Sequence, residues 1–349
     1  MGSRIRWFAF GSVLAIAGVL ASPTALARAS SPFIQHLGTL GGDQSFALGI
    51  NDHTAVVGYS AAANGLQHAF LWRRGRMIDL GVAPSGISIA TAINERGQVV
   101  GYSSSPSSTC PCHGFLLRNG VLTDLGGLGG DRTIPRALND RGDVVGGATT
   151  PDGAIHAFLW HDGVLTDLGV GTGEAQGINK QRQVVGGTML GRAFLWEDGV
   201  LTDLGLPPGM AFAGAFRIND RAQVIGTASP AGIKAAMAFV WEDGAFTDLG
   251  SLGDRINIPR AINNRGDIVG NSGGVAFLWH AGTLTDLGTL LPIGSGWTSL
   301  VPTGINNSGQ IVGVGSLTGI GTRAFLMRDP LGRDDDREED QGSGVEGQE

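Results

Sequence analysis

Charged residues are scarce in this 349-residue chain, and so are cysteine and tyrosine. Asp, Glu, Lys and Arg make up 16% of the residues, and there are two cysteines and two tyrosines. Residues 331–349 hold eight acids and two arginines, a net of −6 out of a whole-chain −7. With the three arginines of residues 1–29 set apart, residues 30–330 carry −4. A body this close to neutral has no electrostatic reason to hold a phosphate backbone, so we expect no nucleic-acid partner.

Metalloprotease and nucleotide-binding motifs are also missing. The chain has no His-Glu-x-x-His pair and no Gly-Lys-Ser/Thr phosphate loop. The glycine-dense stretch Gly313–Gly319 lacks dinucleotide-binding spacing, and glycine abundance here reflects repeated turns. We therefore predict no catalytic residues, no cofactor and no metal.

Long apolar runs are confined to the N-terminus. Arg4 and Arg6 precede an uncharged run of about 15 residues from Trp7 to Ala21, followed by Ala25-Leu26-Ala27. The run is shorter than the roughly 20 residues that span a bilayer. We interpret residues 1–29 as a cleaved signal peptide. This predicts a secreted or periplasmic protein with no membrane span after cleavage.

The two cysteines, Cys110 and Cys112, flank Pro111. An even count in an exported chain favours a disulfide, although a Cys-Pro-Cys bridge would close a very short, strained loop. Unreacted thiols are the alternative. A soft-metal or redox role is a third reading, because His113 adds only a third ligand.

Seven copies of one pattern fill the rest of the chain. Each copy has an Ile-Asn or Leu-Asn step, a Val-Val-Gly-like run, an Ala-Phe-Leu-Trp-like run and, in six copies, an Asp-Leu-Gly step. The period is 40 to 45 residues, and the Asn residues are Asn51, Asn94, Asn139, Asn179, Asn219, Asn263 and Asn306. Such a period with several short strands is typical of propeller-like repeats.

Turn residues divide each copy into four strands. Four copies read Asn-x-x-Gly after the first strand, the composition of a type I turn; the other three end in Thr54, Arg182 and Ala222 and predict a looser turn. Asp-Gly or Asn-Gly dipeptides after the third strand predict tight hairpins. The second and third strands are continuous apolar runs, as expected of strands buried on both faces. The small residue before Phe predicts close approach of neighbouring sheets, and the recurring Trp predicts core packing.

The last copy lacks its fourth strand, and the N-terminus holds one. Residues 33–38 read Phe-Ile-Gln-His-Leu-Gly, a fourth strand with His for Asp. We predict that this segment pairs with the last copy and removes an exposed sheet edge. The expected fold is an all-β, seven-bladed β-propeller of four-stranded antiparallel blades spanning residues 30–329, closed by the N-terminal strand and monomeric. Residues 330–349 are expected to be an acidic disordered tail, with calcium attraction as the alternative.

Taken together, these motifs resemble the HAF repeats of bacterial extracellular proteins. His68-Ala69-Phe70 and His156-Ala157-Phe158 match the name as they stand, and the resemblance covers residues 34 to 328. The departures are Gly114 for Ala, and Arg192, Met237, Val275 and Arg323 where the motif has His. The resemblance implies secretion and a repeat fold. It carries no established activity or catalytic residues.

Residues that recur with the repeat have structural interpretations. Asp next to Leu-Gly is expected to cap the backbone of the following loop. His68, His113 and His156 share one strand position, where we expect hydrogen bonding, with a shared metal as the alternative.

Candidate binding residues lie in the irregular connections between and within copies. Trp297 is the one tryptophan outside the signal and the repeat position, and it predicts either a stacking platform or a loop anchor. Two similar loops contain Asp131, Arg132 and Arg136, and Asp254, Arg255 and Arg260. Paired arginines suit a carboxylate or sulfate of an acidic polysaccharide, whereas an Asp–Arg pair that orders each loop is the alternative.

These features predict a secreted scaffold that binds an extracellular glycan or envelope protein through its irregular loop face. The alternative is an extracellular polysaccharide hydrolase or lyase that uses loop carboxylates. A purely structural envelope role is a third possibility.

Overall fold

The computed structural model describes residues 33–82, 86–105, 112–232, 234–253 and 256–332. These belong to one compact unit, Pro32–Glu349. The predicted signal peptide, Cys110, Asp254, Arg255 and all of the predicted tail after residue 332 lie outside the described residues. No helix among the described residues is long and apolar enough to cross a membrane.

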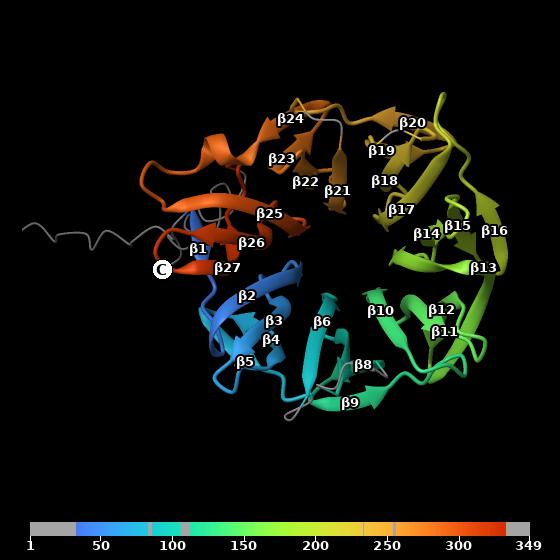
Figure 1. Cartoon of the computed structure of the whole chain (residues 1–349), viewed down its shortest axis with the longest axis horizontal. Helices are drawn as coiled ribbons and strands as arrows, with labels where there is room; N and C mark the ends of the chain where they lie inside the picture. Colours follow the sequence, from blue (N-terminus) through green and yellow to red (C-terminus); the bar gives the residue numbers. More distant parts are fainter. Residues whose placement is uncertain (1–32, 83–85, 106–111, 233, 254–255, 333–349) are drawn as a thin grey trace, which may run out of the picture. The chain divides into compact units, whose positions relative to one another are not determined.

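The unit is an all-β propeller. Five four-stranded antiparallel sheets and one seven-stranded sheet, β10 to β16, stand radially around a common axis (Figure 1). Within each four-stranded sheet the strands are antiparallel neighbours, and the sequence motifs recur in the same order. The described residues contain no α-helix, and their one helical turn is the 3-10 helix η1 (Leu287–Leu290).

Four strand positions repeat from the axis outward. The inner strands are β2 (Gly41–Ile50), β6 (Ile87–Ile93), β10 (Thr133–Leu138), the second half of β13 (Val164–Ile178), β17 (Phe212–Ile218), β21 (Asn257–Ile262) and β25 (Trp297–Ile305). The second strands are β3 (Val56–Ala62), β7 (Val99–Ser104), β11 (Val144–Thr149), β14 (Val184–Thr188), β18 (Val224–Ser229), β22 (Ile268–Ser272) and β26 (Ile311–Leu317). The third strands are β4 (Gln67–Arg73), β8 (Cys112–Arg118), β12 (Ile155–His161), β15 (Ala193–Glu197), β19 (Met237–Glu242), β23 (Val275–His280) and β27 (Gly321–Met327). The outer strands are β1 (Ile34–His36), β5 (Arg76–Asp79), β9 (Val121–Asp124), the first half of β13, β16 (Val200–Asp203), β20 (Ala245–Asp248) and β24 (Thr283–Asp286).

The seven-stranded sheet differs from the expected separate blades. The outer strand of the third copy and the inner strand of the fourth are one continuous strand, β13, which pairs with β12 through its first half and with β14 through its second. The connection between these halves is short, and Gly169 and Gly171 pass through it with positive φ angles of 71°. Glycine adopts this conformation without a Cβ penalty, so the chain crosses without a protruding loop.

The short turns have the conformations that their sequences predict, except that one expected difference between copies is absent. Asn-Gly and Asp-Gly at the third hairpins have positive φ at both positions, as type I′ turns require; Asn119 has φ 52° and Gly120 φ 78°. The turn after the inner strand is the same in all seven copies. The fourth residue of the turn, counted from the Asn, donates its N–H to the Asn carbonyl in every copy, including those with Thr54, Arg182 and Ala222. Those three residues adopt positive φ themselves (59°, 69° and 59°), so the expectation of a looser turn was wrong.

The core lies between neighbouring sheets. Ala193 of the fourth copy packs in the same cluster as Phe239 of the fifth, which lies in the next sheet, and both are buried. Five of the seven repeat Phe side chains are among the largest fully buried ones, and the Ala before Phe is buried in all six copies that have it, as close approach of neighbouring sheets requires. Trp72 and Trp160 are buried and the other repeat tryptophans pack against the clusters, which confirms their core role.

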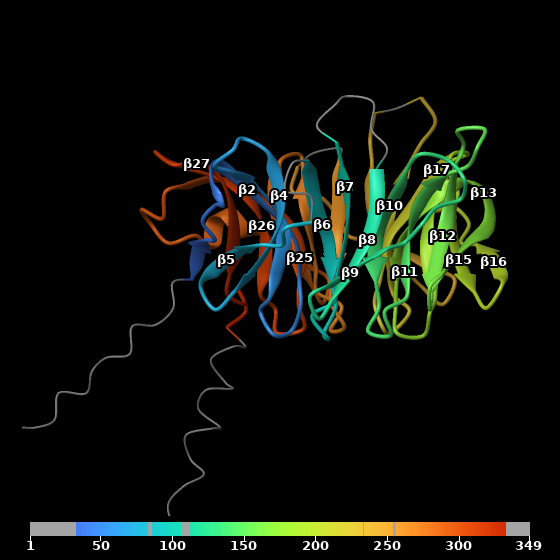
Figure 2. The ribbon, with the colours of Figure 1, turned by 90° about the horizontal axis from the view of Figure 1, so that it is seen from below.

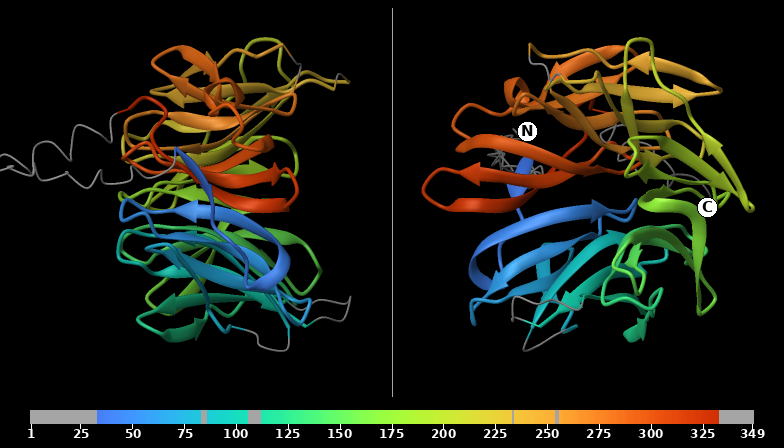
Figure 3. Two further views of the ribbon diagram at one scale, coloured as in Figure 1. Left: turned by 90° about the vertical axis from the view of Figure 1, so that its left-hand side faces the viewer. Right: turned by 45° about the vertical axis from the view of Figure 1, so that its right-hand side comes forward.

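The first described strand lies beside the last sheet. β1 pairs with β27 in antiparallel register, Ile34 opposite Met327 and His36 opposite Phe325. Figure 3 shows this first segment passing from the last sheet into β2. We name the side with the inner–second turns the turn face and the side with the second–third and outer–inner connections the loop face. Short hairpins line the turn face and longer connections the loop face (Figure 2).

Candidate functional site

A ring of asparagines holds the ends of the inner strands. All seven repeat asparagines are buried. Each Nδ2 donates to the backbone carbonyl of the next repeat asparagine at 2.9–3.2 Å, and Asn306 donates back to Asn51 at 3.1 Å. Each Oδ1 also accepts backbone N–H groups of its own turn, as in Asn94, where Arg96 and Gln98 donate. The ring therefore fixes the geometry of the axis at the turn face.

The residues that follow these asparagines surround a cavity of about 220 Å³ at the turn face. They share one role, because six of them donate their backbone N–H to the side chain of the next member. The seven are Asp52, Glu95, Asp140, Lys180, Asp220, Asn264 and Asn307. The carboxylates are thus tied into the fold, and this end of the axis is acidic.

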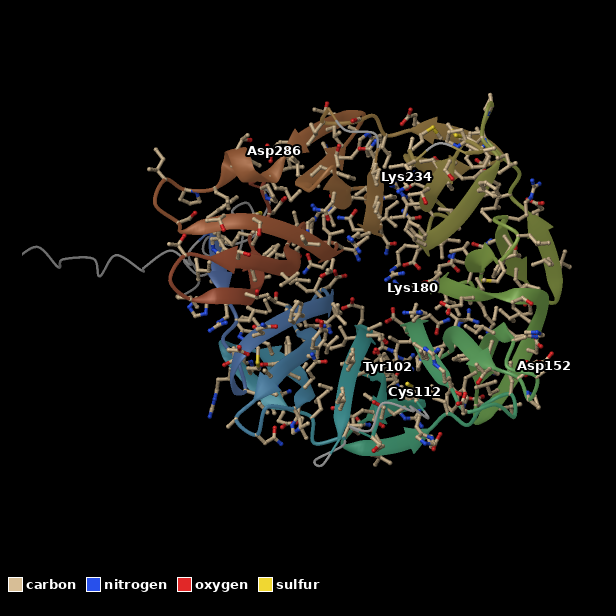
Figure 4. The ribbon with its side chains drawn as sticks, in the orientation of Figure 1. Tyr102, Cys112, Asp152, Lys180, Lys234 and Asp286 are labelled. Carbon is tan, nitrogen blue, oxygen red and sulfur yellow. The ribbon has the colours of Figure 1, made fainter. Side chains whose placement is uncertain are left out.

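One lysine interrupts the acidic ring. Lys180, labelled near the centre of Figure 4, places Nζ 3.1 Å from Asp220 and 3.7 Å from Asp140. The hydrogen bond to Asp220 raises the pKa of Lys180, and burial raises the pKa of Glu95. No group of three or more His, Cys, Asp or Glu within the described ranges is arranged to hold a metal ion. The side chains around the turn-face cavity hold one another through these hydrogen bonds and ion pairs.

A second cavity, of about 370 Å³, lies at the loop-face end of the axis. Every inner strand has a β-bulge at the residue three before its Asn. A bulge redirects a side chain, and all seven bulged residues line this cavity. They are Leu48, Thr91, Arg136, Gln176, Phe216, Arg260 and Thr303. Arg217, Ile258 and Pro259 complete the lining. We call this space the arginine cavity.

The three arginines of this cavity differ in their partners. Arg136 forms an ion pair with Glu174 at 3.0 Å, and Arg260 donates to Asn271 at 3.4 Å. Arg217 donates through one nitrogen to the backbone carbonyls of Gln176 and Phe216. No carboxylate among the described residues pairs with Arg217 or Arg260. Burial, with Arg136 and Arg260 nearby, lowers the pKa of Arg217 to about 10, so Arg217 remains charged at neutral pH.

The two end cavities meet at an aliphatic section in the middle of the axis. A third cavity of about 230 Å³ shares Arg136 and Arg217 with the arginine cavity and shares seven aliphatic residues with the turn-face cavity. These are Ile50, Ile93, Leu138, Ile178, Ile218, Ile262 and Ile305. The axis is therefore acidic at one end, apolar in the middle and basic at the other end.

The predicted site residues lie in different places. Trp297 opens β25, is half-buried and packs edge-on against Phe325 at 5.7 Å, which favours an anchoring role. Arg136 and Arg260 come together in the arginine cavity. Asp131 and Arg132 are exposed beside Thr149, whose Oγ1 donates to Asp131 and accepts from the Arg132 backbone.

Other predicted site residues lie outside the described residues. These are Asp254 and Arg255, which were predicted together with Arg260, and Cys110. Cys112 is buried at the start of β8, where its backbone N–H donates to the Asp131 carbonyl.

The repeated Asp side chains, and two of the three repeated His side chains, form hydrogen bonds as predicted, whereas His113 is exposed. The outer-strand aspartates accept the N–H of the glycine two residues later in all six copies. His68 and His156 each place Nδ1 2.7 Å from the aspartate of the neighbouring strand. Gly270–Gly274 has the Gly-x-Ser-x-Gly spacing, but Ser272 is buried in a β-hairpin and accepts the N–H of Leu252. It has no strand–turn–helix elbow to expose a nucleophile.

The sequence reading missed Arg217 and the acidic ring, although both leave a signal. Six copies have Gly or Ala two residues before the Asn, and the fifth copy has Arg217. A large charged residue at a position that is otherwise small breaks the repeat and deserves a functional explanation. The acids recur directly after the Asn in four copies, the remaining three having Lys or Asn.

The sequence matches no protein-family model and no curated protein. Solved structures share the fold. A prolyl endopeptidase aligns over 85% of this chain and 50% of its own, with 9% identity and a TM-score of 0.59. A puromycin-hydrolyzing peptidase of Mycobacterium tuberculosis aligns over 84% and 53%, with 14% identity and a TM-score of 0.52. TolB from Acinetobacter baumannii aligns over 71% and 62%, with 11% identity and a TM-score of 0.44. The chain spans between half and two thirds of these proteins, and the likeness to the two peptidases shows the fold alone.

Proposed function

We propose that this protein is an exported binding scaffold that takes an extracellular glycan or protein at the centre of its loop face. The observation that supports this proposal is the arginine cavity, which residues from all seven inner strands line. A rigid sheet framework with variable loops positions ligand-binding groups.

The proposal includes a monomeric ring of seven blades closed by the N-terminal strand, of the HAF repeat type. Three observations support it. The asparagine hydrogen bonds return from Asn306 to Asn51, β1 pairs with β27, and β13 contributes to two neighbouring four-strand sets. Export is proposed from residues 1–29, and association with the periplasm or the extracellular space follows from it.

Co-sedimentation tests this function directly. Residues 30–349 are incubated with isolated envelope and with extracellular polysaccharides, and retained protein and soluble products are measured together. We expect retention without new reducing ends or unsaturated products. The double variant Arg136→Gln/Arg260→Gln should reduce retention at least about ten-fold, because charge-assisted hydrogen bonds are lost. Arg141→Gln, an exposed arginine on a turn-face turn, is the matched control.

Each outcome separates the candidate functions. Unchanged retention of the double variant would contradict binding at the arginine cavity. Product formation would replace the scaffold with a hydrolase or lyase. Failure to bind any envelope or polysaccharide fraction would leave only a structural role.

A further inference from the structure

The arginine cavity has more positive side chains than the nearby carboxylates neutralise. Arg136, Arg217 and Arg260 line it, and Glu174, which pairs with Arg136, is the one carboxylate that contacts them within the described residues. Arg217 is half-buried in the lining of the cavity, and two like charges, Arg136 and Arg260, lie near it. Such an arrangement favours an anionic ligand, because guanidinium groups bind carboxylates through paired hydrogen bonds.

Other groups in the cavity act as hydrogen-bond acceptors. Thr91 Oγ1 donates to the Pro135 carbonyl at 2.9 Å, and Thr303 Oγ1 donates to the Ala47 carbonyl at 2.9 Å. Each hydroxyl has one hydrogen, so toward the cavity these oxygens can accept only. Gln176 donates its amide to Glu174 at 2.9 Å and keeps its carbonyl oxygen as an acceptor. The cavity therefore combines cationic donors with acceptors that match ligand hydroxyl groups.

The shape of the cavity selects a small group with an apolar side. Phe216 and Pro259 contribute apolar surface to the lining. The volume of about 370 Å³ is in the lower part of the range for small-molecule sites. Because strands surround the cavity on every side, a ligand enters along the axis. A polymer can insert its end or a side branch, but it cannot lie across.

We propose that the arginine cavity binds one acidic sugar residue, a uronic acid at the end or on a branch of a polysaccharide. The carboxylate lies on Arg217 between Arg136 and Arg260. The sugar hydroxyls donate to Thr91, Thr303 and Gln176, and an apolar face of the ring packs on Phe216. This inference rests on the proposed function and names its ligand class.

Calorimetric titration of residues 30–349 tests the ligand class with three probes. Sodium D-glucuronate has the sugar ring and the carboxylate, D-glucose has the ring alone, and sodium acetate has the carboxylate alone. We expect glucuronate to bind at least about ten-fold more tightly than either of the others, because each partial ligand leaves charged or polar groups unmatched. Acidic oligoglutamate serves as a fourth probe for a peptide ligand.

Variants locate the site. Arg217→Gln should weaken glucuronate binding about ten-fold or more, and Arg217→Lys should restore only part of it, since an ammonium lacks the planar fork. Arg141→Gln should bind as the wild type does, and unchanged thermal midpoints would show that the variants fold. Gln176→Leu gives a second test that leaves the arginines in place and should also weaken glucuronate more than acetate.

Three results would overturn the inference. Equal affinity for acetate would reduce the cavity to a simple anion site, and preference for oligoglutamate would make the ligand a peptide. No glucuronate binding, in a protein still retained by polysaccharide, would reject the sugar acid and leave the scaffold function standing. Loss of polysaccharide retention with glucuronate binding intact would instead reject the wider function.

Discussion

At the scale of single residues, the buried carboxylate of Asp143 shows how hydrogen bonds offset the cost of burying a charge. Asp143 is 1% exposed, and it accepts hydrogen bonds from Asn139 Nδ2, Arg182 Nε and His161 Nδ1 at 2.6–3.0 Å. Burial alone would raise the pKa of this carboxyl. The bonds from Asn139, Arg182 and His161 outweigh burial and hold the pKa below its ordinary value. Arg182 belongs to the next copy, so the contact also joins neighbouring copies.

This arrangement predicts a dependence of stability on pH. Because the pKa of Asp143 is lower in the folded protein, its contribution is present above the unfolded pKa near 4 and is lost as pH falls through the folded pKa. Asp143→Asn should lower the free energy of unfolding at pH 7 by on the order of 3 kcal/mol, because Arg182 loses its partner. It should also flatten the fall in thermal midpoint between pH 5 and pH 2. Asp162→Asn, whose side chain is 89% exposed, is the control. If the thermal midpoint of Asp143→Asn falls between pH 5 and pH 2 as steeply as that of the wild type, Asp143 does not cause this pH dependence.

At the scale of elements, the glycine at the third position of each Val-Val-Gly run lies against the backbone of the inner strand, close to its bulge. A Cβ added at Gly58, Gly101, Gly146, Gly186, Gly226, Gly270 or Gly313 would overlap the carbonyl oxygen five residues before the repeat Asn. That carbonyl lies two residues before the bulged residue of the inner strand, so the close approach is next to the bulge. The glycine and the bulge therefore depend on each other, and the bulge in turn directs side chains into the arginine cavity.

Two adjacent glycines in β14 test this dependence. Gly186→Ala places its Cβ against the Glu174 carbonyl, whereas the Cβ of Gly187→Ala would meet only the Gly214 Cα at 3.7 Å. Gly186→Ala should destabilise the fold by about 1–3 kcal/mol or more, since backbone must move. Gly187→Ala should change stability by less than about 1 kcal/mol. Denaturant unfolding of the two variants measures both effects. Equal destabilisation would show that the overlap is not the cause.

The elements were largely predictable from the sequence, and the axial cavities were not. Turn dipeptides and apolar runs follow directly from local chemistry, so the four strands of each copy and the aspartate caps were predicted. Thr54, Arg182 and Ala222 were predicted to be in looser turns because composition cannot show that the fold imposes positive φ on them. Arg136 and Arg260 were assigned to loops. A β-bulge has no recognisable sequence pattern. The sequence therefore does not show that the Arg136 and Arg260 side chains point toward the axis and lie near Arg217.

At the scale of the whole molecule, the first and last copies share one core. Leu37, Ala47 and Phe70 pack in the same cluster as Val312 and Ala324. Ser45 links the same regions, because its Oγ donates to the Gly38 carbonyl at 2.7 Å and accepts the Ala324 N–H at 3.0 Å. Such contacts join segments nearly three hundred residues apart, which means that the ends of the chain stabilise each other.

Removal of the first strand tests the proposed closure. A protein lacking residues 30–38 loses the β1–β27 pairing and the burial of Ile34 and Leu37. Burying two large aliphatic side chains contributes roughly 1.5–3 kcal/mol each, so the thermal midpoint should fall by several degrees, on the order of 10 °C. The exposed edge of β27 should also promote self-association.

A synthetic peptide of residues 30–40 sharpens this test. Added in excess to the shortened protein, it should raise the thermal midpoint in a concentration-dependent way, because a ligand that binds only the folded state stabilises it. A peptide of the same composition in scrambled order should have no effect. If the shortened protein melts at the wild-type temperature and remains monomeric, the N-terminal strand does not close the ring. The asparagine hydrogen bonds and the direct contacts of β2 with the last copy must then join the first copy to the last.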